Sequence, residues 1–544
     1  MTAERPDLTR RQLLTGGVAL AVAGAAVPAR PAHADTPRRG GVFRIGLSDP
    51  PHFDPHLTVQ WATNIALSFT HSRLLKYRAG PGVGPGTFPI EGDLAESWTR
   101  TSDTTYVFKL RRGVRWHPKP PVNGRELTAE DVKYTYDRFL GVVGNPSRAL
   151  LDDVDKVEAL DRYTVRITLK APDAWLLDAL ASTTACIVAR EVVEQHGDLK
   201  RHETCIGTGP WMLDRYERNA RLVWVRHPDY FVAGLPRADG IEAWMEADAS
   251  SRLARWLNGQ FDFSPNLGMV VRRVDLDVVR ARKPGLQTAE MLWAVGAYGA
   301  MKLDREPFKD VRARRALALA TSWREVLAAN PIALGHGVPS PAIPPALVDW
   351  SIPADQLSAE GRRLYEHDRA GAERLLAEAG YAGGLKVPLE TASFGSDWLD
   401  GVQAYVAQWK AAGIQADLRL KEPGAFMSSA IFGKFDRLML STRGGQLFPD
   451  PYLAAFYLPG QQPNASGVDD PKLTEMIRLQ RRTFDAAKRR EILWDIQRYL
   501  AEQVYYLYGP AARVVAAWDA HVRNFAPNLG NDYGGRLMAA WLDR

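Results

Sequence analysis

Residues 105–132 read TYVFKLRRGVRWHPKPPVNGRELTAEDV, and this stretch holds the pattern that decides the fold class. Apolar and polar side chains alternate from Thr105 to Leu110, which predicts a half-buried β-strand. Thr128 can then cap a helix whose apolar side chains recur at helical spacing, at Val132, Tyr136, Phe139 and Leu140. The pattern therefore changes from strand to helix within this one stretch.

The same two signals recur outward from this stretch. Residues 41–46, 163–169 and 387–390 are predicted to be strands. Three aspartates can each cap a following helix: Asp310, Asp368 and Asp470. Strands that alternate with helices along a chain indicate an α/β fold.

Two finer predictions concern the second half of the chain and its loops. The helix after Asp310 is expected to carry four apolar residues on one face: Leu319, Trp323, Val326 and Leu327. Segments 80–89 and 338–345 are rich in proline and glycine, and both are predicted to be surface loops.

The first 34 residues have the composition of an export signal. Arg10 and Arg11 precede Gln-Leu-Leu, an apolar stretch covers residues 18–27, and Ala32-His33-Ala34 forms a cleavage site. The adjacent arginines indicate the twin-arginine route, although ordinary secretory signals also contain such pairs. The first cysteine is Cys186, so the cleavage point offers no cysteine for a lipid, and we expect a mature protein free in the periplasm.

Length and charge limit the remaining possibilities. The chain has 544 residues, more than one hydrophobic core accommodates, so at least two lobes are expected. The formal net charge of +6 is dispersed along the chain, and no stretch combines basic with aromatic residues, which argues against nucleic-acid binding. After the export signal, no apolar stretch approaches the roughly 20 residues that a bilayer requires.

Cys186 and Cys205 are the only cysteines. In an oxidising compartment an even number of cysteines favours a disulfide, whereas two buried free thiols are the alternative. Only His202 lies near them in the sequence, so the pair does not predict a metal site.

Several short motifs, in this order and spacing, resemble the large solute-binding family that includes the dipeptide-, oligopeptide- and nickel-binding periplasmic proteins of ABC importers, solute-binding protein family 5. The resemblance covers nearly the whole chain after the export signal. The motifs are Phe53–His56, Asp93–Trp98, Phe108–His117, Leu127–Val132, Gly207–Trp211, His227–Tyr230, Pro307–Arg312 with Arg315–Leu317, and Asp450-Pro451.

The resemblance implies a type II-like, large-cluster periplasmic-binding-protein fold. It implies that two α/β lobes enclose a small solute by hinge closure and deliver it to the permease subunits of an importer, as a monomer without a cofactor or catalytic residues. The implied division is 38–85, 206–298 and 520–544 for lobe one, 86–205 for an inserted domain, and 299–519 for lobe two.

The resemblance also locates a pocket, and the pocket departs from the family pattern. Peptide-binding relatives carry an aspartate three residues before the Asp/Glu-Pro dipeptide, where it pairs with the peptide's α-ammonium. Here that position is Leu447, which follows Gln446. Arg443 can accept a carboxylate or phosphate instead, or it is a solvated surface residue. We therefore expect a ligand without a free peptide amine, which is either peptide-like or a non-peptide such as an acidic or sugar-linked molecule.

The same resemblance indicates further residues that could line the pocket. They are Val59, Gln60 and Trp61 after the first strand, Ser393 and Phe394 after the strand at 387–390, and Tyr298 with Lys302 near the crossover between lobes. Packing or loop cover is the alternative for each of them. For Lys302 the alternative is a salt bridge with Asp304 or Glu306.

An enzyme and a metal-binding protein are the two alternative functions. The chain lacks a G-x-S-x-G elbow, a phosphate-binding glycine-lysine loop and an H-E-x-x-H pair, so we expect no enzyme, although exported enzymes also use the twin-arginine route. His52 and His56 are flanked by prolines, which disfavours a bare-metal site, whereas a metal chelate of the nickel type remains an alternative ligand.

Overall fold

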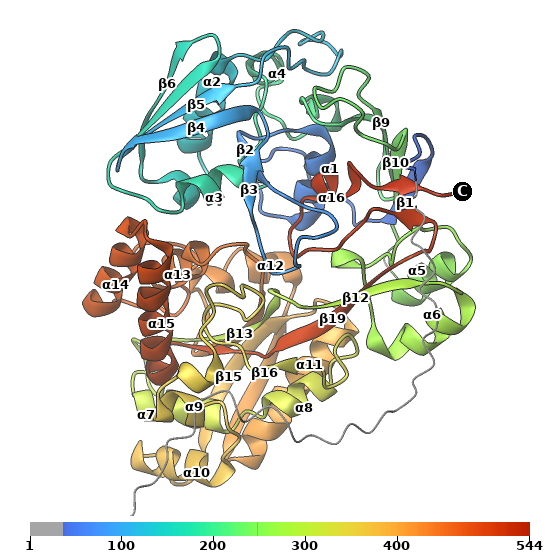
Figure 1. Ribbon diagram of the computed structural model, residues 1–544. Helices are drawn as coiled ribbons and strands as arrows, with labels where there is room; N and C mark the ends of the chain where they lie inside the picture. The colour runs from blue at the N-terminus through green and yellow to red at the C-terminus, as the bar shows by residue number, and fades with distance from the viewer. Residues whose placement is uncertain (1–35, 247) are drawn as a thin grey trace, which may run out of the picture. The chain divides into compact units, whose positions relative to one another are not determined.

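The computed structural model describes residues 36–246 and 248–544 (Figure 1). Residues Arg38–Arg544 form one unit of this structure. The predicted export signal, residues 1–34, lies outside the described residues. Within the part that is described, no helix has the length and hydropathy of a membrane span. We keep the predicted division and call the three parts lobe one, the inserted domain and lobe two.

The sheet of lobe one has the order β1 (Val42–Gly46), β10 (Gly240–Trp244), β9 (Arg221–Arg226) and β8 (Trp211–Glu217). β1 runs parallel to β10, and the other neighbours are antiparallel. The strand predicted at 41–46 is thus confirmed. The helices of this part are α1 (Trp61–Thr70), α5 (Ala249–Leu257), α6 (Leu276–Arg282) and α16 (Tyr533–Leu537), and a short strand pair joins β20 (Val522–Arg523) to β21 (Trp541–Leu542).

The inserted domain contains an antiparallel sheet with the order β4 (Ala95–Ser102), β5 (Thr105–Leu110), β7 (Thr164–Leu169) and β6 (Val154–Asp161). Helix α2 (Ala129–Gly141) begins after Thr128, which forms a capping box with Asp131. The strand and the helix predicted from residues 105–132 are therefore confirmed. The remaining helices here are α3 (Leu176–Ala181) and α4 (Arg190–His196), and β3 (Ile90–Gly92) pairs with β2 (Leu75–Tyr77) of lobe one.

Lobe two is built on a mixed sheet with the order β16 (Ile414–Lys421), β15 (Leu385–Ala392), β17 (Leu438–Arg443), β13 (Gly296–Met301) and β18 (Tyr506–Tyr508). β15 is parallel to both of its neighbours, and β13 is antiparallel to both of its own. The surrounding helices are α7 (Val311–Leu319), α8 (Trp323–Ala328), α9 (Ala359–Arg363), α10 (Arg369–Glu378), α11 (Ser396–Ala411), α12 (Pro423–Met427), α13 (Asp450–Tyr457), α14 (Pro471–Arg482) and α15 (Ala486–Gln503).

The three predicted aspartate caps are confirmed. Their carboxylates accept hydrogen bonds from backbone N–H groups in the first turn of α7, α10 and α14, at 2.8, 2.8 and 3.1 Å: Asp310, Asp368 and Asp470. The single helix expected from Leu319 to Leu327 is wrong. α7 ends at Leu319, and Ser322 caps α8 by accepting from the N–H of Glu325.

Segment 338–345 is predicted to be a surface loop, and most of it is buried, including Ala342 and Ile343. We call residues 339–352 the proline loop. Gln497 of α15 holds it, because its side chain donates to the carbonyl of Trp350 at 3.0 Å and accepts from the N–H of Ile352 at 3.1 Å. Prolines mark the absence of regular structure, but they do not determine burial when backbone groups find partners elsewhere.

Two neighbouring strands connect the lobes. β12 (Gln287–Leu292) pairs antiparallel with β19 (Ala511–Trp518), from Gln287 opposite Trp518 to Leu292 opposite Arg513. The chain passes from β12 into β13 and from β18 into β19, so both crossings lie side by side (Figure 1). Two further short strands, β11 (Val270–Val271) and β14 (Gly337–Val338), also pair with β19.

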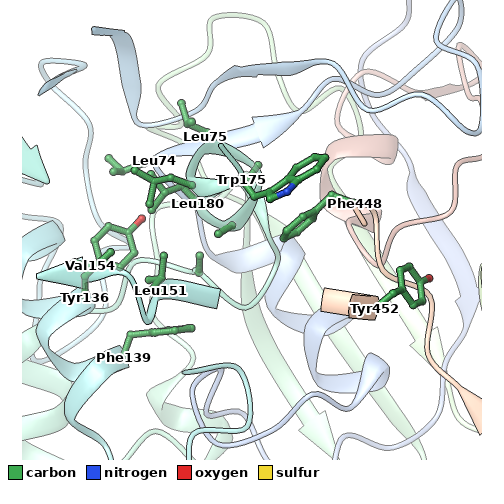
Figure 2. Packing of buried hydrophobic residues seen from close by; sticks show 14 of the residues in the cluster. Leu74, Leu75, Tyr136, Phe139, Leu151, Val154, Trp175, Leu180, Phe448 and Tyr452 are labelled. Atoms are coloured by element: carbon green, nitrogen blue, oxygen red, sulfur yellow. The ribbon is translucent and has the colours of Figure 1, made fainter. Parts of the chain in front are cut away.

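The largest buried apolar cluster extends from the inserted domain into lobe two. It contains Tyr136 and Trp175 of the inserted domain together with Phe448, Tyr452 and Tyr506 of lobe two. Figure 2 shows Trp175 beside Phe448, where the ring centroids lie 5.8 Å apart. The two parts therefore share apolar area that water does not reach.

Candidate functional site

Arg443 is a buried cation at the end of β17, with only 5% of its surface exposed. Its Nη1 donates to the carbonyl of Ala342 in the proline loop at 2.6 Å. The guanidinium carbon lies 4.2 Å from the ring centre of Tyr508 and 4.7 Å from that of Tyr452. The alternative of a solvated surface arginine is therefore wrong.

Arg443 is poorly satisfied compared with another buried arginine. Arg314 donates to three backbone carbonyls, those of Phe308, Lys309 and Gln503. Arg443 has one carbonyl partner and a hydrogen bond with the Tyr508 hydroxyl, and its buried Nε has no hydrogen-bond partner within the described chain. No carboxylate of the described residues forms an ion pair with it either. A buried guanidinium in this state retains unused donors and an uncompensated charge.

The rings around Arg443 belong to a group of tyrosines that stay neutral. Burial raises the pKa values of Tyr452 and Tyr508, and the charge of Arg443 opposes that rise. The hydroxyl groups of Tyr457 and Tyr508 lie 2.6 Å apart. Electron-rich ring faces stabilise a cation without neutralising it, so this setting holds the guanidinium in place and leaves its positive charge uncompensated.

A small cavity of about 50 Å³ adjoins this group on lobe two. Its lining includes Ala342, Tyr365, Tyr506 and Tyr508, so it shares a wall with the Arg443 environment. Arg443 also lowers the pKa of Tyr365, which burial raises more strongly. We call Arg443, Ala342, Tyr452 and Tyr508 the Arg443 site.

Leu447 lies between the lobes. It is half-buried and packs against the large apolar clusters on both sides. A Cβ built on Gly530, in the C-terminal segment of lobe one, would lie 3.0 Å from Leu447 Cδ1. Gln446 is exposed, and its N–H donates to the Tyr452 hydroxyl at 2.7 Å. The position that carries a carboxylate in peptide-binding relatives is thus an apolar contact here.

Tyr298 lies beside this site, because it is opposite Tyr508 where β13 pairs with β18, and the charge of Arg443 opposes the rise that burial causes in its pKa. Lys302 makes its contacts elsewhere. Tyr298 is a core residue on β13, with its ring 5.3 Å from that of Phe456. Lys302 Nζ donates to the carbonyl of Gly433 at 3.1 Å and lies 5.3 Å from the ring of Phe435. It forms no ion pair with Asp304 or Glu306 in the described structure, so that alternative is wrong.

The remaining predicted lining residues lie on separate surfaces. Val59 is 57% exposed, Gln60 is exposed before α1, and Trp61 packs partly against lobe one. Ser393 is exposed after β15, and Phe394 lies against Trp398 and Phe426, with ring centroids 5.8 and 6.1 Å apart. Their contact with a ligand stays a prediction.

The predicted disulfide is not formed in this structure, where Cys186 and Cys205 are buried free cysteines. The thiol of Cys186 donates to the carbonyl of Thr183 at 2.9 Å, and Cys205 Sγ lies 3.2 Å from Thr70 Oγ1. Burial raises the pKa values of the two thiols to about 12 and about 11, respectively, which keeps both protonated. Each thiol therefore has a polar neighbour without a bridge.

The motifs that carry the family resemblance have structural roles. Asp54 of the Phe53–His56 motif is fully buried and pairs with Arg138 of α2 at 2.5 Å. Asp450 of the Asp-Pro dipeptide binds Arg481 of α14 through two hydrogen bonds of 2.8 and 2.7 Å. Both acids therefore form ion pairs within the chain, and Asp450-Pro451 begins α13, the helix that carries Tyr452 of the Arg443 site.

Sequence reasoning missed the partners of Arg443. The run Tyr505-Tyr506-Leu507-Tyr508 was available as a signal, because three tyrosines in four residues are unusual. Ala342 could not be predicted, because it contacts Arg443 through its backbone carbonyl, and every residue type has one. The two residues are also 101 positions apart in the sequence.

Comparison with known proteins agrees with the fold. Residues 89–464 match the family of bacterial extracellular solute-binding proteins, family 5 Middle. Di/tripeptide-binding protein 1 of Pseudomonas aeruginosa strain UCBPP-PA14 is 27% identical, with 84% of this chain and 86% of that protein covered. The dipeptide-binding protein of Escherichia coli K12 is 26% identical, with the same shares covered.

Solved structures resemble the fold over nearly their whole length. The oligopeptide-binding protein AppA of Bacillus subtilis, in complex with a nonapeptide, has a TM-score of 0.78 at 19% identity and covers 94% of this chain and 100% of its own. AgaA of A. tumefaciens R10, in complex with agropinic acid, has a TM-score of 0.77 at 22% identity, with 93% and 99% covered. The α/β, two-lobed binding-protein fold is thus confirmed, and the chain belongs to family 5 of the bacterial extracellular solute-binding proteins.

Proposed function

We propose that this chain is the periplasmic solute-binding component of an ABC importer, and that it holds its solute between the lobes through an anionic group paired with Arg443. The observation that carries the proposal is the buried guanidinium with one carbonyl partner and two ring faces. Taking a charge out of water is costly unless a partner compensates it. A carboxylate or phosphate on the solute would supply that partner, with the planar geometry that a guanidinium binds well.

Leu447 also favours an anionic solute, because it cannot pair with a peptide's α-ammonium. A peptide's α-ammonium would need a carboxylate where Leu447 offers only methyl groups. The curated relatives are named for dipeptides and di/tripeptides, and solved relatives hold a nonapeptide and agropinic acid. The fold is therefore compatible with both classes, and the local residues favour an anionic solute without a free amine.

Capture would proceed by hinge closure at the crossing strands β12 and β19. A solute that contacts both lobes binds the closed state better and shifts the equilibrium toward it. The closed monomer would then be the form that permease subunits recognise. This role requires no catalysis and no resident cofactor.

Native mass spectrometry of the mature chain, with identification of any released mass, tests the ligand class. We expect an anionic molecule without a free peptide amine. The second measurement is calorimetric titration with agropinic acid and with an unblocked dipeptide as probes, on the wild type, Arg443→Gln and Leu447→Asp. Tight dipeptide binding to the wild type that survives Arg443→Gln would overturn the proposal.

A further inference from the structure

The inserted domain contacts lobe two at a place that is distinct from the Arg443 site. The contact is made by the loop that precedes α3 in the inserted domain, and by α14, α15 and the proline loop in lobe two. The N–H of Ala174 donates to the carbonyl of Arg481 at 2.7 Å, across the boundary between the two parts. Figure 1 shows α3 close to α13 and α14.

Trp175 is the centre of this contact and is 2% exposed. Its Nε1 donates to Oε1 of Gln480 at 2.7 Å. Its ring lies edge-on to Trp350 at 5.0 Å and tilted against Phe448 at 5.8 Å. Arg489 stacks on the other side, with its guanidinium carbon 4.4 Å from the ring centre. We call Trp350, Phe448, Gln480 and Arg489 the Trp175 receptor.

Hydrogen bonds within lobe two hold two side chains of the receptor. Gln480 is fully buried, and its Nε2 donates to Oδ1 of Asp450 at 2.8 Å, which fixes its Oε1 as the acceptor for the indole. Arg489 Nη1 donates to the carbonyl of Thr483 at 2.8 Å. A buried aromatic anchor that fills a prepared pocket of another aromatic and an arginine has the composition of an interface hot spot.

Because of the chain connectivity, this contact depends on whether the lobes are closed. The inserted domain is continuous with lobe one at both of its ends, whereas lobe two is joined to lobe one through the crossing strands. In Figure 1 those strands, β12 and β19, lie toward one side of the molecule, and α3 with α14 lies toward the other. When the lobes open at the crossing strands, Trp175 must leave its receptor.

The proline loop links the two sites. Its Ala342 carbonyl accepts from Arg443, and its Trp350 ring packs against Trp175, eight residues further along. The loop is fixed between these points by Ser351, whose Oγ donates to the carbonyl of Ile343 at 2.9 Å. The Arg443 site and the Trp175 contact therefore share one buried segment.

We propose that Trp175 is a positioning residue that stabilises the closed state by entering the Trp175 receptor, and that it raises affinity for the solute without touching it. This inference rests on the proposed capture of a solute between the lobes. The free energy of the contact favours closure in the empty protein as well as in the loaded one.

Hydrogen exchange of the ligand-free mature chain tests this directly, because the Ala174 N–H crosses the boundary. Trp350→Ala alters the receptor and leaves the peptide that contains Ala174 unchanged. We expect the Ala174 amide to exchange about tenfold faster or more, while amides in the middle of β5 and β7 keep their rates. The radius of gyration from small-angle scattering should rise at the same time.

A second variant keeps the test decisive if Trp350→Ala disturbs the whole fold. Trp175→Phe retains a ring and removes only the indole hydrogen bond, so we expect an intermediate increase of Ala174 exchange and an unchanged melting temperature of the inserted domain. Trp98→Ala is the matched control, since Trp98 is a half-buried tryptophan of the same domain, opposite Phe108 in the sheet. It should leave Ala174 exchange unchanged.

Unchanged Ala174 exchange and an unchanged radius of gyration in both Trp350→Ala and Trp175→Phe would overturn the proposal, because the contact would then belong to one rigid body. These readouts need no solute, so they do not depend on the ligand class proposed above. Titration of Arg443→Gln with agropinic acid tests the Arg443 site by a different measurement, so the failure of one proposal is distinguishable from that of the other.

Discussion

Two buried arginines of this chain have opposite surroundings. Arg138 reaches Asp54 at 2.5 Å, and this pair joins the inserted domain to the loop after β1. Arg443 has one carbonyl and two tyrosine rings. Where the chain supplies the acid, the arginine fixes the fold. At Arg443 the chain supplies neither an acid nor the three carbonyls that satisfy Arg314, and we infer that a solute supplies the anion.

The largest effect on stability is expected from breaking the ion pair between Arg138 and Asp54. Arg138→Leu leaves the fully buried Asp54 without its cation, which should lower the free energy of unfolding by about 3–5 kcal/mol. Chemical denaturation measures the change. As a control, Arg190→Leu removes an exposed pair with Glu194, and solvent screening should make its effect on unfolding far smaller. Equal losses in the two variants would contradict the distinction.

At Arg443 we expect a small effect on stability and a large effect on affinity for the solute. Arg443→Gln removes a charge that lacks an internal partner, so the free energy of unfolding should change by less than about 1 kcal/mol. Affinity for the anionic molecule released from the wild type should fall by about 2–5 kcal/mol, measured by calorimetric titration. A variant that unfolds as readily as Arg138→Leu and binds normally would assign Arg443 to the fold.

Placing a carboxylate at position 447 should increase affinity for peptides that have a free amine. Leu447→Asp restores the carboxylate that peptide-binding relatives carry, and a charged hydrogen bond to an α-ammonium contributes about 1.5–3 kcal/mol. We expect a gain in dipeptide affinity of that order, read from titration with an unblocked dipeptide. Leu447→Asn is the matched control without charge. If the two variants bind the dipeptide equally, the carboxylate does not act as an amine anchor.

The smallest effect concerns a buried acid without an arginine of its own. Burial, and next the charge of Asp450, raise the pKa of Asp173 to about 7. Arg481, Arg489, Asp153 and Tyr106 also act on it. Because this pKa is raised above its usual value of 3.8, the stabilising contribution of the protonated group is complete below about pH 4 and is lost as pH rises through 7.

Lowering the pH from 8 to 6 should therefore slow exchange of the Ala174 amide, corrected for intrinsic rates, by an amount equivalent to about 1 kcal/mol. Asp173→Asn mimics the neutral acid and keeps an oxygen for the N–H of Trp175. It should reduce this pH dependence without abolishing it, since burial also raises the pKa of Asp178 to about 7. A pH dependence that is identical in the wild type and the variant would contradict the assignment to Asp173.

Local signals in the sequence predicted the fold well. The alternation from Thr105 to Leu110 and the caps at Asp310 and Asp368 depend on neighbours within a few residues, so they could be recognised directly. The helix break at Ser322 was missed because capping competes with continued helix at the same residues. Short-range patterns do not decide that competition.

The candidate site was only partly predictable. Leu447 and Arg443 were found because a family motif fixes their position, but the surroundings of Arg443 depend on long-range contacts. Its carbonyl partner Ala342 lies on a loop whose composition indicates exposure, and Tyr508 follows 65 positions later in the chain. Burial of a charged residue is a property of the assembled lobe, and residue type alone does not reveal it.

The antiparallel pair of β12 and β19 has a consequence for the path of closure. Two strands held by ladder hydrogen bonds bend easily out of their common plane, whereas sliding one along the other breaks every bond between them. The connection therefore favours bending over sliding. On the proposed closure we expect Trp175 to return to the same place on lobe two each time.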